Sequence, residues 1–147
     1  MLRNKITSTR LTLGDSGWHI SYMIYTKDSE YRVKFYLNSR TGQSHPLDYI
    51  NKLPPKEKAK VLKYIEFLRE HKGILDEPYS RHIKDKIREL RVDFARNRFR
   101  IFYFLFVGKT IIILHAFSKR TPKTPVSEIN RAERNYYDVL KNQKLYE

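Results

Sequence analysis

Hydrophobic and polar residues alternate along three consecutive stretches in the second half of the chain. In residues 87–94, Leu90 and Val92 are separated by charged residues, and the same kind of alternation recurs over residues 98–107 and 109–117. A period of two is typical of a β-strand with one buried face. These stretches therefore predict three successive strands.

The first half of the chain contains a further strand and two helices. Residues 31–37 alternate by parity and predict a strand, whereas His45 to Asn51 fits a short helix. Leu53-Pro54-Pro55 breaks the chain, and a proline is well tolerated in the first turn of a helix. Residues 56–71 then predict an amphipathic helix ended by Gly73. Its apolar face carries Val61, Leu62, Ile65 and Leu68.

The C-terminal part predicts one more helix. Thr124 is expected as its N-cap and Pro125 as its first residue. Residues 74–86 are expected to form a loop or short turn, and residues 107–110 a tight hairpin. The predicted order is strand, helix, helix, three strands, helix, which is an α+β domain. The inner face of the last helix carries Ile129, Ala132, Tyr136 and Leu140, with Tyr136 and its neighbour Tyr137 expected to be packing residues.

The first 30 residues fit two interpretations. A Gly/Asp/Ser cluster at residues 14–17 separates two β-prone runs, which favours a hairpin. The same residues also fit an extension whose role the sequence leaves open. We therefore divide the chain into an N-terminal extension, residues 1–30, and one domain, residues 31–147.

Charge narrows the range of functions. The 147 residues carry a formal net charge of +14, and such an excess usually serves an anionic partner, nucleic acid first. By segment, the net charge is +1 for residues 1–30, +4 for 31–80, +9 for 81–125 and 0 for 126–147. Most of the excess therefore lies on the predicted strands, where arginines share a sheet with an apolar face.

Several classes of protein are disfavoured. There are no cysteines, so disulfides and thiolate chemistry are absent. The longest apolar run, residues 101–107, is far too short to span a membrane, and we recognise no signal peptide. We expect a soluble cytoplasmic protein with no membrane partner. Neither paired carboxylates nor histidines with metal-ligand spacing accompany the basic residues, so we expect no metal and no cofactor.

The basic residues predict a site for RNA cleavage at one edge of the sheet. Attack by a 2′-hydroxyl requires a proton acceptor, positive charge on the phosphate and a proton for the leaving oxygen. An arginine fork matches phosphate oxygens, and a lysine crowded by cations has a lowered pKa, which suits it to proton transfer. The candidate catalytic residues are Arg91, Arg100, Lys119, Arg120 and Lys123, and the candidate RNA-binding residues are Arg98, Tyr103 and His115.

Three runs of sequence, residues 89–91, 98–104 and 114–125, resemble the RelE/ParE toxin superfamily, nearest its HigB-like, phage-related branch. The resemblance extends over residues 31–141. It implies an antiparallel sheet with two N-terminal helices on one face and a C-terminal helix. It also implies a type II toxin that cleaves mRNA on the ribosome, and a helix-turn-helix antitoxin through which the toxin reaches operator DNA.

The resemblance assigns the five candidate catalytic cations to the basic positions of the family, with two departures. The family often has two lysines where this chain has Lys119 and Arg120, and a glycine where it has Ala116. Because arginine deprotonates far less readily than lysine, a proton-transfer role moves to Lys119 or Lys123.

Structural roles remain open for each candidate. Arg91 and Arg100 are both placed to pair with Glu89 or Asp93 across strands, and the three cations after residue 118 fit a solvated loop. His115 shares parity with the apolar residues of its strand, which favours packing. Tyr103 fits the core as well as the site.

Two other functions remain open as well. A ParE-like protein inhibits DNA gyrase through protein contacts, and the fold alone does not separate that activity from a nuclease. A non-catalytic RNA- or DNA-binding module would use the aromatics between the arginines for stacking. The concentration of cations at one sheet edge favours the nuclease.

Overall fold

The computed structural model describes residues 13–14, 17–18 and 30–147. Within the first 30 residues, β1 (Leu13–Gly14) pairs antiparallel with β2 (Gly17–Trp18), at the place where the sequence predicts a hairpin. The rest of the predicted extension lies outside the described residues. None of the helices in the described part of the chain is long and apolar enough to cross a membrane.

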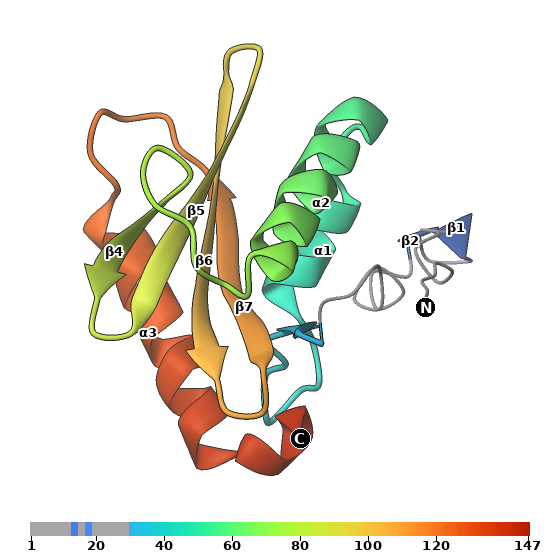
Figure 1. Ribbon diagram of the computed structural model, residues 1–147, viewed down its shortest axis with the longest axis vertical. Helices are drawn as coiled ribbons and strands as arrows, with labels where there is room; N and C mark the ends of the chain where they lie inside the picture. The colour runs from blue at the N-terminus through green and yellow to red at the C-terminus, as the bar shows by residue number, and fades with distance from the viewer. Residues whose placement is uncertain (1–12, 15–16, 19–29) are drawn as a thin grey trace.

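A five-stranded mixed sheet forms the centre of the domain (Figure 1), with the strand order β3-β7-β6-β5-β4. Only β3 and β7 run parallel, and every other neighbouring pair is antiparallel. The prediction of an antiparallel sheet is therefore wrong at this edge, because β3 and β7 are joined by a long crossover that contains α1, α2 and β4–β6 rather than by a hairpin. The strands are β3 (Arg32–Phe35), β4 (Ser80–Lys84), β5 (Ile87–Phe94), β6 (Asn97–Phe106) and β7 (Thr110–Ser118).

Among the described residues, three α-helices and a 3₁₀ segment complete the fold. The helices are α1 (His45–Asn51), α2 (Pro55–Glu70) and α3 (Val126–Lys141), followed by the 3₁₀ segment η3 (Gln143–Tyr146). Ser44 caps α1 by accepting a hydrogen bond from the amide of Leu47. The predicted α+β class and the order of the long elements are confirmed.

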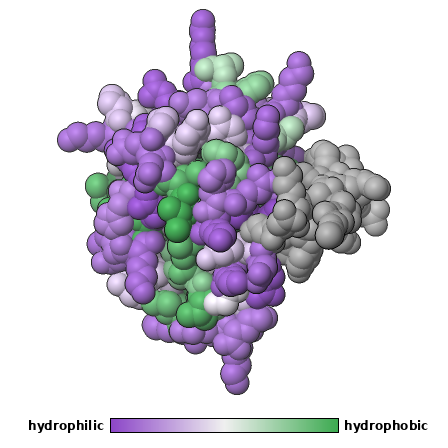
Figure 2. Space-filling model, viewed as in Figure 1, coloured by the Kyte–Doolittle hydropathy of each residue, from purple (hydrophilic) through white to green (hydrophobic). Residues whose placement is uncertain are grey.

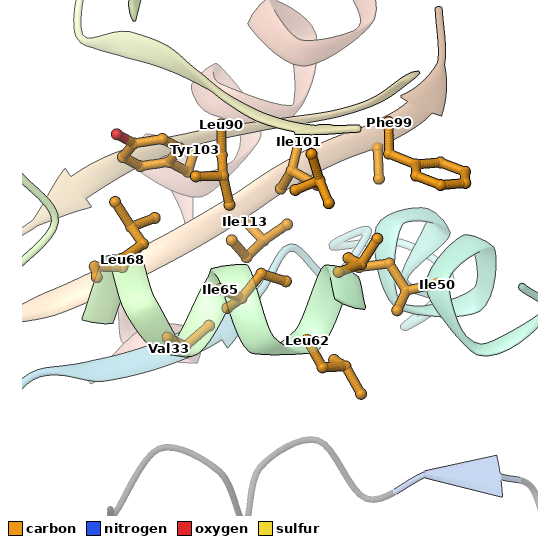
Figure 3. Close-up of a cluster of buried hydrophobic side chains, with 14 of the residues drawn as sticks. Val33, Ile50, Leu62, Ile65, Leu68, Leu90, Phe99, Ile101, Tyr103 and Ile113 are labelled. Atoms are coloured by element: carbon orange, nitrogen blue, oxygen red, sulfur yellow. The ribbon is translucent and has the colours of Figure 1, made fainter. Parts of the chain in front are cut away.

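Each face of the sheet is covered by its own hydrophobic core. In Figure 1, α1 and α2 lie on one side of the sheet and α3 on the other. The first core joins Ile50 of α1 and Ile65 of α2 to Leu90, Ile101 and Ile113 of the sheet (Figure 3). The second core joins the buried side of α3 and η3 to the opposite face. It contains Phe102, Phe104, Leu114, Ala132, Tyr136, Val139 and Tyr146.

Residues 74–86 do not form the predicted loop throughout, because Ser80–Lys84 is strand β4 at the edge of the sheet. Only Ser80 is buried in this strand, and the other four residues are at least partly exposed. An edge strand with one neighbour and charged side chains carries little hydrophobic alternation. The sequence pattern therefore gave no signal for β4.

The start of α3 differs from the prediction by one residue. Pro125 is the N-cap and Val126 the first helical residue, and no side chain caps the helix. The hydroxyl of Thr124, the predicted cap, instead donates a hydrogen bond to Glu89 on β5 over 3.2 Å. This contact ties the loop before α3 to the sheet.

Candidate functional site

The alternation of β5 and β6 places charged residues on the α3 side of the sheet. Leu90 and Val92 lie in the first core, as do Phe99 and Ile101. Because successive side chains in a strand point to opposite faces, the residues between them face the α3 side. These residues are Glu89, Arg91, Asp93, Arg98 and Arg100. Hydrophilic side chains cover most of the face of the molecule shown in Figure 2, with some hydrophobic ones among them at the end where β5 and β6 meet.

The centre of this charged group is Glu89, whose side chain is completely buried. One carboxylate oxygen lies 3.2 Å from Nε of Arg81 and 3.9 Å from Nε of Arg91. The other oxygen accepts the hydrogen bond from Thr124. A buried carboxylate needs such partners. Glu89 therefore holds Arg81 and the loop before α3 in place and lies beside Arg91.

Arg81 belongs to this site, although the sequence did not single it out. It lies on β4 directly opposite Glu89 in the strand register. Because β4 was expected to be a loop, no pattern in the sequence placed Arg81 beside Glu89. Arg81 would have been found only if residues 80–84 had been identified as a charged edge strand.

Arg100 is buried deeply for a charged residue and exposes only 2% of its surface. Its Nη1 donates hydrogen bonds of 2.9 Å to the carboxylate of Asp93 and to the carbonyl of Phe99. Nε is buried and has no hydrogen-bond partner among the described residues. Arg100 thus makes the predicted cross-strand ion pair and keeps one donor unused.

Lys119 is the first residue after β7 and is also buried, with 8% of its surface exposed. Its backbone amide donates a 2.7 Å hydrogen bond to the carbonyl of Arg98, which holds it beside β6. Among the described residues, its amine forms no ion pair. Burial lowers the pKa of Lys119 below its ordinary value of 10.5, and the charge of Arg100 lowers the pKa further, although Glu89 partly opposes this shift.

The other two predicted catalytic cations are placed differently. Arg120 and Lys123 are both exposed in the segment between β7 and α3. Arg120 lines a small pocket with Arg98 and Lys119, whereas Lys123 does not line it. The structure therefore brings Arg91, Arg100 and Lys119 close together, with Glu89 beside Arg91 and Asp93 beside Arg100, and leaves Lys123 on the surface.

His115 lies on the α3 side because of a β-bulge. The register between β6 and β7 shifts after Phe102, which pairs with His115, so His115 does not share a face with Ile111 and Ile113 as its parity predicts. Its Nε2 lies 2.6 Å from Glu128 in the first turn of α3. Burial lowers the pKa of His115, although Glu128 partly opposes this shift.

Tyr103 lies apart from this cluster. Its ring belongs to the first core, on the opposite face of the sheet, and is completely buried (Figure 3). Its hydroxyl makes a 2.7 Å hydrogen bond with Ser80. Of the three residues predicted to bind RNA, only Arg98, which is exposed on the α3 side, has a side chain free to meet a large ligand.

This arrangement provides two chemical functions in one place. Arg91 exposes 29% of its side chain, and its guanidinium is able to donate to an anion at the surface. Lys119, with its lowered pKa, is suited to accept a proton. Among the described residues, no group of three histidine, aspartate or glutamate side chains is placed to hold a metal ion.

Fold and site together define a small basic α+β protein with a cationic site on one face of a mixed sheet. The chain belongs to the family of phage-derived Gp49-like proteins (DUF891), whose model matches residues 48–137, more than half of its length. The family is one of RelE-like toxins of type II toxin–antitoxin systems. The match contains every residue of the site, from Arg81 to Glu128. No curated protein matches the chain.

Proposed function

We propose that this protein is the toxin of a type II toxin–antitoxin system and cleaves mRNA on the ribosome without a metal ion. The observation that supports this most directly is the group formed by Arg91, Arg100 and Lys119 beside the carboxylates of Glu89 and Asp93. Such a group supplies positive charge and a proton acceptor at one point, and both are needed to cleave RNA by internal attack.

In the proposed reaction, neutral Lys119 accepts the proton of the 2′-hydroxyl. The 2′-oxygen forms a bond to phosphorus while the bond from phosphorus to the 5′-oxygen breaks, and water supplies the proton to the leaving oxygen. The products are a 2′,3′-cyclic phosphate and a 5′-hydroxyl. Lys119 takes this role rather than Lys123, because burial and neighbouring arginines lower its pKa.

The two arginines have different parts in this proposal. Arg91 is partly exposed and lies 3.9 Å from Glu89, a separation that leaves its guanidinium free to reach a phosphate. Arg100 is held by Asp93 and Phe99, so its charge acts from a fixed position beneath the phosphate. A fixed charge requires no reorganisation as the transition state forms.

The proposal also names the partners. The substrate is mRNA in the decoding site of the ribosome, and the neutralising partner is a helix-turn-helix antitoxin, as expected for the HigB-like branch. The protein acts in the cytoplasm and reaches operator DNA only as a complex with the antitoxin. The net charge of +14 favours approach to the ribosome.

The decisive experiment mixes the purified protein with ribosomes programmed with a defined mRNA and maps the RNA ends. We expect cuts that leave 2′,3′-cyclic phosphate or 3′-phosphate ends, and we expect the variant Lys119→Ala to lose them. Exposed Lys141, on the last turn of α3, provides the control variant Lys141→Ala. Intact mRNA in this assay, together with arrested DNA replication and an SOS response in cells that express the protein, would instead indicate a gyrase inhibitor.

A further inference from the structure

A basic pocket of about 150 Å³ lies beside the Glu89 cluster, where the β5–β6 turn meets the segment after β7. Four of the six lining residues are cationic, and none is acidic. The lining residues are Arg96, Asn97, Arg98, Ser118, Lys119 and Arg120. Its size is sufficient for one phosphate group and a few water molecules.

The arginines that line this pocket are not held in ion pairs by the protein. In the part of the chain that the structure describes, Arg96, Arg98 and Arg120 form no ion pair. Asp93 lies opposite Arg98 in the strand register, but its carboxylate is bound by Arg100. This contrasts with the neighbouring cluster, where Arg81 and Arg91 both contact Glu89.

The pocket is also held in shape by hydrogen bonds of its lining residues with each other and with α1 and α2. The amide of Asn97 donates to Glu57 on α2, and the hydroxyl of Ser118 is hydrogen-bonded to Tyr49 on α1. The hydrogen bond from the Lys119 amide to Arg98 joins the two sides. The fold therefore keeps like charges close together before any ligand arrives, and an anion would relieve their repulsion.

The spacing along β6 relates this pocket to the proposed cleavage site. Arg98 and Arg100 are two residues apart on the same face of the strand, which corresponds to roughly 7 Å. Neighbouring phosphates in an extended single strand have a similar separation. Lys119 lines the pocket and also lies among the charges of the Glu89 cluster. A single strand of RNA is therefore able to contact the pocket and the proposed cleavage site at the same time.

We propose that this pocket binds a second phosphodiester of the RNA strand, adjacent to the phosphodiester that is cleaved. The proposal rests on the proposed function, because it takes the strand to be the RNA substrate. Arg96, Arg98 and Arg120 hold this second phosphate, and they position the strand with its scissile phosphate at Arg91 and Lys119. Phosphate contacts of this kind set register and carry no base preference.

The test measures binding of a short single-stranded RNA made uncleavable by 2′-O-methyl groups, using fluorescence anisotropy. A series of such RNAs carries one neutral methylphosphonate each, placed at successive positions. For the wild-type protein, we expect a methylphosphonate at one position, next to the cleavage point, to weaken RNA binding roughly tenfold. In the variant with Arg96→Ala and Arg98→Ala, we expect that same neutralisation to change the affinity less than twofold.

The salt dependence of binding gives a second readout. Loss of one phosphate contact lowers the slope of log affinity against log salt by about 0.7 for a single strand. The matched control is the variant with Arg40→Ala and Arg134→Ala, which removes two exposed arginines that do not line the pocket. We expect this control to keep the position-specific loss.

Additive effects of the variant and the methylphosphonate, or equal losses at every position, would overturn the proposal. If polyglutamate displaces the RNA as effectively as polyuridylate does, the proposal is overturned as well, because the pocket would then not select phosphate. The outcome is independent of cleavage. If the arginine variant and the methylphosphonate show this coupling but the protein leaves ribosomal mRNA intact, the proposed nuclease activity is overturned and the phosphate-binding pocket is retained.

Discussion

Arg91 and Arg100 lie directly opposite each other on β5 and β6, so two like charges face each other on the same side of the sheet. Each lies near a different carboxylate: Arg100 is 2.9 Å from Asp93, and Arg91 is 3.9 Å from Glu89, which it shares with Arg81. Their burial differs, with 29% of the Arg91 side chain and 2% of the Arg100 side chain exposed. The pair therefore combines one fixed charge with one that is able to move.

This difference predicts opposite effects of two alanine variants. Arg91→Ala removes a partly exposed charge, so we expect the free energy of unfolding to fall by less than about 1 kcal/mol. Arg100→Ala removes a buried stem and two hydrogen bonds, and we expect a loss of about 2–3 kcal/mol. Urea denaturation measures both values, and cleavage of ribosomal mRNA is expected to fall in both. Equal stability losses would contradict the assigned roles.

Replacing Lys119 by arginine separates charge from proton transfer. Lys119→Arg keeps a cation but does not release a proton near neutral pH, so we expect mRNA binding to persist and cleavage to fall by at least about a hundredfold. Lys123→Arg is expected to reduce cleavage far less, because the exposed Lys123 contributes charge alone. Single-turnover cleavage measures the rate, and the control Lys141→Arg checks for general effects. Comparable losses at residues 119 and 123 would refute the choice of Lys119.

The wild-type reaction should depend on pH in one direction. Since the neutral amine of Lys119 accepts the proton, the cleavage rate is expected to rise with pH through neutrality. It should level off below pH 10.5, because burial and the charge of Arg100 lower the pKa of this group. A rate that falls as pH increases from 6 to 8 would exclude this role.

The same residue is expected to reduce the stability of the fold. Because the pKa of Lys119 is lower in the folded protein than its ordinary value of 10.5, the unfolded chain binds the proton more strongly. Stability therefore rises with pH from the folded-state pKa up to about 10.5, and below that interval the full cost is present. We expect Lys119→Met to stabilise the protein by about 1 kcal/mol at pH 7. Urea denaturation at pH 7 and 10 should show this gain shrinking.

The sequence predicted the long elements because their alternation and helical spacing reflect burial directly. It did not predict β4, whose four residues after Ser80 are partly or fully exposed. Parity counting also groups His115 with Ile111 and Ile113, although the bulge in β7 puts His115 on the opposite face of the sheet. A single extra residue in a strand leaves no mark on composition.

The candidate site was predicted in part for the same reason. Arg91 and Arg100 follow from alternation on neighbouring strands, and the structure places them opposite each other. The separation of Lys119 from Lys123 was not predictable, because it depends on how the segment after β7 folds back over the sheet. Arg81 was missed with β4, and the central position of Glu89 follows only from the contacts with Arg81 and Thr124.

Because of His115, we expect the free energy of unfolding to decrease in acid. Burial lowers its pKa below the ordinary value of 6.5, and Arg131 and His45 add to this effect against Glu128. The unfolded chain therefore binds the proton more strongly, so the stabilisation present above pH 6.5 is lost as the pH falls toward the folded-state pKa. We expect the free energy of unfolding to drop less between pH 7.5 and 5.5 in His115→Gln than in the wild type. An equal or larger drop in the variant would contradict this prediction.

Replacing Gly73 is expected to destabilise the fold, because its backbone conformation and its surroundings both disfavour a Cβ atom. Helix α2 ends in a Schellman arrangement, in which the amide of Gly73 donates to the carbonyl of Leu68 over 2.9 Å. Gly73 has φ +77°, and a Cβ added there would collide with the side chain of Leu105. We expect Gly73→Ala to lower the free energy of unfolding by about 1–2 kcal/mol, since strain contributes about 1 kcal/mol and displacement of the partly exposed Leu105 side chain adds the remainder.

Gly108 provides the matched control for this substitution. It has a similar φ of +75°, but an added Cβ would meet no atom within 4 Å. Gly108→Ala therefore contains the backbone strain alone, and we expect it to cost about 1 kcal/mol. The difference between the two variants in urea denaturation isolates the contact with Leu105, which is 40% exposed and has room to turn toward solvent. The double variant with Leu105→Ala should bring the cost of Gly73→Ala close to that of Gly108→Ala, and a persistent gap would show that α2 itself has been displaced.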